Sequence, residues 1–145
     1  MPVDVHDTQA WARSNRAAWE LRPLVEMVRG ERRQVGFVLN LYARIPVEMR
    51  PSPERDRAVL ATWDRLREIA VSLAGLGREG EQVEVAPFDA AARLRSENHF
   101  EPEVLLESRI VHPARYLDAV APDEREHLQP LEQRLRELGI RPGHW

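Results

Sequence analysis

The stretch that decides the fold is Gln34–Ile45, which reads QVGFVLNLYARI. Apolar residues occupy every second position from Val35 to Ile45, and glycine, asparagine, tyrosine and arginine fill most places between them. This period of two predicts a β-strand with one apolar face, which Pro46 ends. A long amphipathic segment follows, and then a second strand near Val83, so the sequence predicts a β-α-β unit.

The segment after this strand has the features of a surface helix. Ser52 is suited to cap it, Pro53 fits its first turn, and Glu54 lies near the positive end of the helix dipole. We expect a helix from residue 53 to about residue 74, with its charged residues largely off the buried face. The apolar stripe consists of Val59, Trp63, Leu66, Ile69, Ala70, Leu73 and Leu76.

The N-terminal part carries a helical pattern. Asp7 and Thr8 are good capping residues, and small or apolar residues share one helical face as far as Leu21, which predicts a helix over residues 7–21. Pro23 interrupts the pattern. It either kinks the helix or takes the first position of a second helix. Leu24, Val25 and Val28 continue the apolar stripe, with Gly30 as its stop.

The second half of the chain adds strands and helices in alternation. These are strands at 82–86 and 103–111, a helical turn at 89–94, and helices at 113–120 and 122–138. The strand at 103–111 has apolar residues on both faces, so we expect it to be central. The last helix ends in a Schellman-like motif at Gly139.

The predicted order α-β-α-β-α-β-α implies an α/β or α+β fold. We expect about three strands in a mixed sheet, with helices packed on it. The length suits a single domain over residues 1–145.

Composition excludes several classes of function. The net charge is −3 and the charges are interspersed, whereas nucleic-acid binders usually show a basic face, so we expect no nucleic-acid partner. The N-terminus has no leader pattern and no stretch is apolar over the ~18 residues of a membrane span, so we expect a cytoplasmic protein without a membrane segment. Cysteine and lysine are absent, and the 21 basic residues are all arginine, which excludes disulfides, thiolate metal sites and lysine chemistry.

Residues 53–112 combine a long helix, a glycine-containing loop and three short motifs. These are VEVAPFD at 83–89, RLR at 93–95 and LLESRIV at 105–111. In this order of elements and motifs the region resembles the small nucleotidyltransferase-fold proteins related to the partners in toxin–antitoxin pairs. Active members of that family carry a Gly-Ser pair and an Asp-x-Asp motif, which hold two Mg²⁺ ions against a nucleoside triphosphate.

The chain departs from that family at the residues that carry the activity. It has no Gly-Ser pair, and Gln34 and Gly36 stand where the resemblance places the two aspartates. Only Glu84 lies where the third carboxylate is expected. One carboxylate does not hold a two-metal site, so the resemblance implies a degenerate or ligand-binding domain.

Arginine and histidine residues gather around the strand at 103–111. An Arg/His group of this kind can bind a phosphate or transfer protons. The alternative is that Arg93 and Arg95 form surface ion pairs with Glu97 and Glu101, each worth at most ~1 kcal/mol. The candidate anion-binding residues are Arg93, Arg95, His99, Arg109 and His112.

Other motifs give weaker predictions. Glu124 and His127 have a Glu-x-x-His spacing, but a helical metal site needs two such motifs and further glutamates, so we expect no bound metal.

Trp11 and Trp19 flank the first helical stripe. They are candidate anchors for a protein partner, since tryptophan is enriched at binding hot spots. Alternatively, they cover the sheet within one subunit.

We therefore expect a non-enzymatic interaction or regulatory protein, with no cofactor, that associates with itself or with another protein. The alternative is a nucleotidyltransferase-like domain acting on an anionic or nucleotide substrate through Glu84 and the Arg/His group. A third possibility is a module that contacts phosphate or nucleic acid through the same arginines.

Overall fold

The computed structural model describes residues 4–45, 52–73, 82–85, 94–95, 103–111 and 128–143. Its helices are α1 (Val5–Ser14), α2 (Pro53–Leu73) and α4 (Gln129–Glu137). Its strands are β1 (Ala18–Val28), β2 (Glu31–Arg44), β3 (Gln82–Val85), β4 (Leu94–Arg95), β5 (Glu103–Val111) and β6 (Arg141–Pro142). None of the helices in these ranges has the length and apolar character needed to cross a membrane.

The strands form one mixed sheet in the order β3-β5-β2-β1-β6, and β4 also pairs with β5. Neighbouring strands are antiparallel except for β1 and β6, which are parallel. Because β2 and β3 both run antiparallel to β5, they are parallel to each other and have β5 between them. The mixed α/β character and the central place of β5 are thus confirmed.

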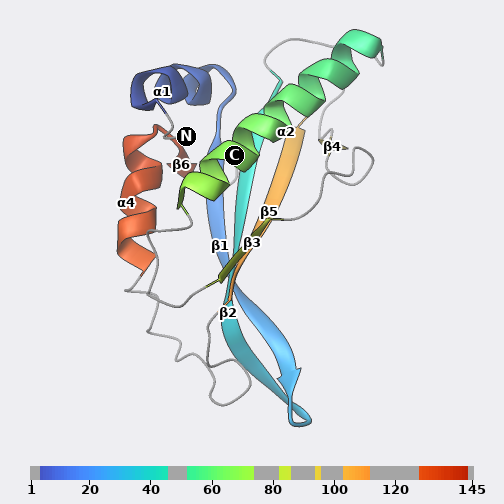
Figure 1. Cartoon of the computed structure of the whole chain (residues 1–145), viewed down its shortest axis with the longest axis vertical. Coiled ribbons are helices and arrows are strands. Elements are labelled where there is room, and N and C mark those ends of the chain that lie inside the picture. The colour runs from blue at the N-terminus through green and yellow to red at the C-terminus, as the bar shows by residue number, and fades with distance from the viewer. Residues whose placement is uncertain are drawn as a thin grey trace.

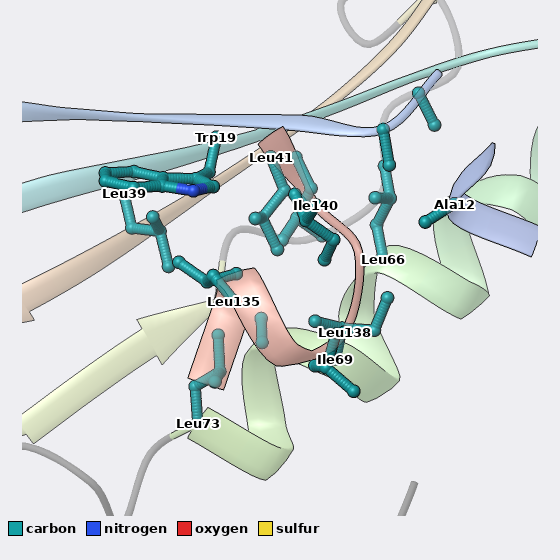
Figure 2. Packing of buried hydrophobic residues seen from close by; sticks show 14 of the residues in the cluster. Ala12, Trp19, Leu39, Leu41, Leu66, Ile69, Leu73, Leu135, Leu138 and Ile140 are labelled. Atoms are coloured by element: carbon teal, nitrogen blue, oxygen red, sulfur yellow. The ribbon is translucent and has the colours of Figure 1, made fainter. Parts of the chain in front are cut away.

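One hydrophobic core joins the helices to a single face of the sheet (Figure 1). Figure 2 shows Trp19, Leu39 and Leu41 of the sheet with Leu66 of α2 and Leu135 of α4. Each fully buried side chain of this size contributes about 1.5–3 kcal/mol through removal of its apolar surface from water. The core therefore fixes the helices on this face, and the opposite face of the central strands lies away from it.

The predicted helix at 53–74 is confirmed as α2. The backbone N–H of Arg55 donates a hydrogen bond of 3.1 Å to Ser52 Oγ, as expected of a capping serine. The predicted apolar stripe is buried as far as Leu73, and Leu76, its last predicted member, lies outside the described residues. Its buried members are Val59, Trp63, Leu66, Ile69, Ala70 and Leu73.

The C-terminal stop is also confirmed. Gly139 has a φ of +79°. Its N–H donates to the carbonyl of Arg136, and the N–H of Ile140 donates to that of Leu135, both at 3.0 Å. These two bonds define a Schellman motif. The helix begins at Gln129 in the part that is described, and the earlier residues predicted for it lie outside that part.

The prediction of helices over 7–21 and 24–28 is wrong beyond Ser14, because residues 18–28 form β1. Trp19 faces the core, whereas Glu20 takes part in the opposite face. The carbonyls of Ala17 and Trp19 accept hydrogen bonds from β6 and the residue after it, so the backbone groups of odd-numbered residues point outward. Pro23 is one of these odd-numbered residues. Its missing N–H would point away from β2, so no hydrogen bond between β1 and β2 is lost.

Gly30 ends a strand and not a helix. Val28 pairs with Glu31, and the two residues between them, Arg29 and Gly30, have φ values of 52° and 82°. Two positive φ angles are what a type I′ hairpin turn requires. The sheet therefore has more strands than the three that were predicted, and the order begins α-β-β-α.

Of two other predicted elements, one falls partly and one wholly outside the described residues. Leu94, predicted as the end of a helical turn, belongs to β4, and the rest of that turn lies outside the described residues. The helix predicted at 113–120 also lies outside them.

Candidate functional site

Side chains alternate between the two faces of a strand, so the residues between those of the core project from the opposite side of the sheet. On the three central strands this side carries charged and amide groups beside the apolar residues Leu24, Val38 and Leu105. We call the following residues the polar-face cluster: Glu20 and Arg22 of β1, Asn40 and Tyr42 of β2, and Glu107 and Arg109 of β5.

Strand register arranges this cluster in two rows across the sheet. Glu20, Asn40 and Glu107 are direct neighbours on adjacent strands and form an acidic row. Arg22 and Arg109 lie on either side of Val38 and form a basic row. The two rows are separated by two residues along each strand, which is about 7 Å.

Hydrogen bonds tie the acidic row to Tyr42. The hydroxyl of Tyr42 donates to Glu20 Oε2 at 3.0 Å and accepts from Asn40 Nδ2 at 3.3 Å. Asn40 and Tyr42 are buried, with exposed fractions of 2% and 5%. They are the two most buried residues of the cluster, and its charged residues are more exposed.

The side-chain oxygen of Asn40 lacks a partner. Oδ1 is buried and accepts no hydrogen bond from the described part of the chain. Leaving a buried acceptor unpaired costs about 1–3 kcal/mol, which is a large fraction of the stability of a small domain. A residue of this kind in the middle of a central strand calls for an explanation.

One ion pair connects the two rows. Arg22 Nη2 and Glu107 Oε1 are 3.7 Å apart, and their side chains are 52% and 37% exposed. This distance exceeds that of a hydrogen bond, and pairs this exposed contribute only about 0–1 kcal/mol. The pair therefore opens easily.

A second ion pair on the same face lies where α1 is joined to the end of β2. Arg44 Nε and Glu103 Oε2 are 3.8 Å apart near the end of β2, and the Glu103 side chain is 1% exposed. Asn15 Nδ2 donates to the carbonyl of Arg44 at 2.7 Å, and the backbone N–H of Arg44 donates to the carbonyl of Asn15 at 2.7 Å. These bonds fasten the end of α1 to the end of β2.

The structure places part of the predicted Arg/His group. Arg109 is exposed on β5 and belongs to the basic row. The strand register sets Glu84 opposite Arg109, and Arg95 opposite Glu103. The other three candidates, Arg93, His99 and His112, lie outside the described residues, as do Glu124 and His127.

The two candidate tryptophans differ in position. Trp19 is 6% exposed and belongs to the core cluster, so its ring lies inside the subunit. Trp11 is partly buried against the same cluster, and the guanidinium carbon of Arg65 lies 5.7 Å from its ring centre. Arg65 also forms an ion pair with Asp7, which holds the guanidinium beside the ring.

A second exposed feature is the hairpin tip, which we define as residues 25–34 of β1, the turn and β2. Figure 1 shows that the β1–β2 hairpin extends beyond the three helices. Met27 is 64% exposed and Val25 is 43% exposed, and both side chains belong to β1. Charged residues surround them, and Arg33 pairs with Glu31 at 2.8 Å.

The sequence places Asn40 in the alternating strand but does not identify it as a candidate site residue. The available signal was an asparagine between Leu39 and Leu41, because asparagine is depleted in strands. Its hydrogen-bond partner Tyr42 lies on the same strand. Its cross-strand neighbours Glu20 and Glu107 come from two other strands, and only the register identifies them.

Within the described ranges, no three histidine or acidic side chains lie close enough together to hold a metal ion.

Comparison with known proteins gives no relative: no family model, no curated protein and no solved structure matches the chain.

Proposed function

We propose that this chain is an interaction protein that self-associates through its hairpin tip. The observation that carries the proposal is the exposure of Val25 and Met27 at neighbouring same-face positions on a hairpin that extends beyond the helices. Large apolar side chains grouped at a projecting element are typical of an interface.

The composition of the tip suits a second copy as the partner. Arg29, Arg32 and Arg33 lie close to Glu26 and Glu31, so the tip carries both charges in nearly equal number. In a two-fold contact each residue meets the partner's equivalents, and a mixed surface can then pair its own charges. Covering Val25 and Met27 in both copies would bury four apolar side chains, each worth up to about 1.5–3 kcal/mol.

We expect the two copies to associate through side-chain contacts and not by pairing their strands into one continuous sheet. The outer edge of β1 is covered by β6 only at Ala18 and Trp19. Beyond them Pro23 removes an outward N–H, and the pairing register shifts between Leu24 and Val25. Proline and irregular strands are devices by which proteins keep an edge from pairing with another strand.

Sedimentation velocity over a range of concentrations tests the proposal. We expect the protein to be dimeric and the Met27→Asp variant to dissociate at least ~tenfold more readily, because a charge replaces an apolar side chain that the proposed dimer covers. Leu60→Asp is the matched control, since Leu60 is 44% exposed on α2, away from the tip. A monomer at every concentration, or an equal effect of both variants, would contradict the proposal.

The nucleotidyltransferase-like alternative stays a prediction. The observation in its favour is that Glu84 and Arg109 occupy paired positions on neighbouring strands. A thermal shift with ATP or GTP and Mg²⁺ tests it. Stabilisation by a nucleotide that is weakened in Arg109→Gln would support this alternative, and no stabilisation at millimolar nucleotide would count against it.

A further inference from the structure

The polar-face cluster has an excess of hydrogen-bond acceptors in one row and an excess of donors in the next. In the acidic row, Glu20 and Glu107 flank Asn40 on adjacent strands. In the basic row, the guanidinium groups of Arg22 and Arg109 flank Val38. The two glutamates and two arginines of the cluster therefore balance in charge but are divided between two rows, and Glu84 of β3 lies opposite Arg109 at the outer edge of the basic row.

The unpaired Oδ1 of Asn40 identifies the acidic row as incomplete. Its neighbours in the row are carboxylates, which only accept hydrogen bonds when ionised. The hydroxyl of Tyr42 already donates to Glu20, and it accepts from the other end of the Asn40 amide. The donor that Oδ1 lacks is therefore not supplied by the side chains beside it.

We propose that the polar-face cluster binds a small zwitterion. Its ammonium group donates to Asn40 Oδ1 and to the carboxylates of Glu20 and Glu107. Its anionic group pairs with Arg22 and Arg109. An ammonium group fits the acidic row because it carries three donors and a positive charge. Arginine fits the other end because its planar fork of donors matches a carboxylate or a phosphate.

The spacing of the rows selects among zwitterions. The rows are about 7 Å apart along the strands, which favours a ligand whose charges are separated by several bonds. The side chains of Arg22 and Glu107 now bridge this space at 3.7 Å. On binding, this ion pair would part: Arg22 would pair with the anionic group of the ligand, and Glu107 with its ammonium group.

Access is compatible with this exchange. Arg22 and Glu107 have side-chain exposures of 52% and 37%, whereas Asn40, the cross-strand neighbour of Glu107, is 2% exposed. The charged groups are thus reachable from solvent, and the amide acceptor lies next to them in the register. This proposal is independent of self-association, because the hairpin tip does not include these residues.

Isothermal titration calorimetry with 5-aminovalerate and γ-aminobutyrate tests the proposal, with butylamine and butyrate as the two half-ligands. We expect at least one of the zwitterions to bind at least ~tenfold more tightly than either half, since only the zwitterions engage both rows. Equal binding of butylamine would overturn the zwitterion assignment. No binding of either zwitterion would overturn the site, and would leave Asn40 Oδ1 to a water molecule.

Two variants with matched controls locate the binding. Glu107→Gln and Arg109→Gln each remove one charge from opposite rows, and each should weaken zwitterion binding at least ~tenfold through loss of a charged hydrogen bond. Glu31→Gln and Arg32→Gln make the same changes at the hairpin tip and should leave binding unchanged. Thermal melts verify folding. Unchanged affinity in both polar-face variants would overturn the proposal.

Discussion

The two faces of β2 are made by alternate residues of one short stretch, yet they differ in kind. Leu39 and Leu41 are almost fully buried among residues of the helices. Asn40, between them, is as well buried but lies on the other side with a polar network and an unpaired acceptor. Unpaired buried atoms also occur on the core side, at Trp19 Nε1 and Ser108 Oγ, but there they lie among apolar side chains. The comparison teaches that, within the described strands, only on the polar face does such an atom have charged residues as its cross-strand neighbours.

The largest expected effect comes from moving the polar residue to the wrong face. Leu39→Asn removes a buried side chain and places an unpaired amide in the core, so we expect a loss of about 4 kcal/mol or more in urea unfolding. Leu60→Asn on the exposed side of α2 is the control, with a loss of under about 1 kcal/mol. A similar loss in both variants would mean that Leu39 is not part of a packed core.

A smaller effect is expected within the polar face. Tyr42→Phe removes the donor to Glu20 and leaves Asn40 Nδ2 without its acceptor, so we expect a loss of about 1–2 kcal/mol. Urea unfolding measures it against the wild type. Unchanged stability would show that this hydrogen-bonded network contributes nothing to the fold.

At the hairpin tip we expect a smaller effect on stability, and an increase in place of a loss. Arg29 has a φ of 52° in the two-residue turn, a conformation that asparagine adopts more readily. Arg29→Asn should therefore stabilise the protein by about 0.5 kcal/mol, or about 1–2 °C in a thermal melt. A lower melting temperature would indicate that the Arg29 side chain makes a stabilising contact.

Strong local periodicity made much of the fold predictable. The strands at 82–85 and 103–111, most of β2, the helix α2 and the stop at Gly139 follow from alternation, capping residues and glycine. β1 was missed because Ala17 and Ala18 favour a helix locally. Its strand form depends on pairing with β2, and Arg29-Gly30 is a weaker hairpin signal than Asn-Gly.

The polar-face cluster was predictable only in part. Arg109 was singled out from the sequence, but it was grouped with residues near it in the chain. Its neighbours across the sheet, Arg22 and Asn40, come from distant positions and are brought together by the register of three strands. Because β1 was predicted as a helix, Glu20 and Arg22 had no place on this face.

Asn40→Leu, examined for stability and for binding in the same preparation, tests the central claim most directly. Replacing the amide removes one modest hydrogen bond and one unpaired buried acceptor, so we expect the free energy of unfolding to change by less than about 1 kcal/mol. Binding of 5-aminovalerate should fall at least ~tenfold. A large loss of stability with binding intact would contradict the account, because the amide would then serve the fold and not a ligand.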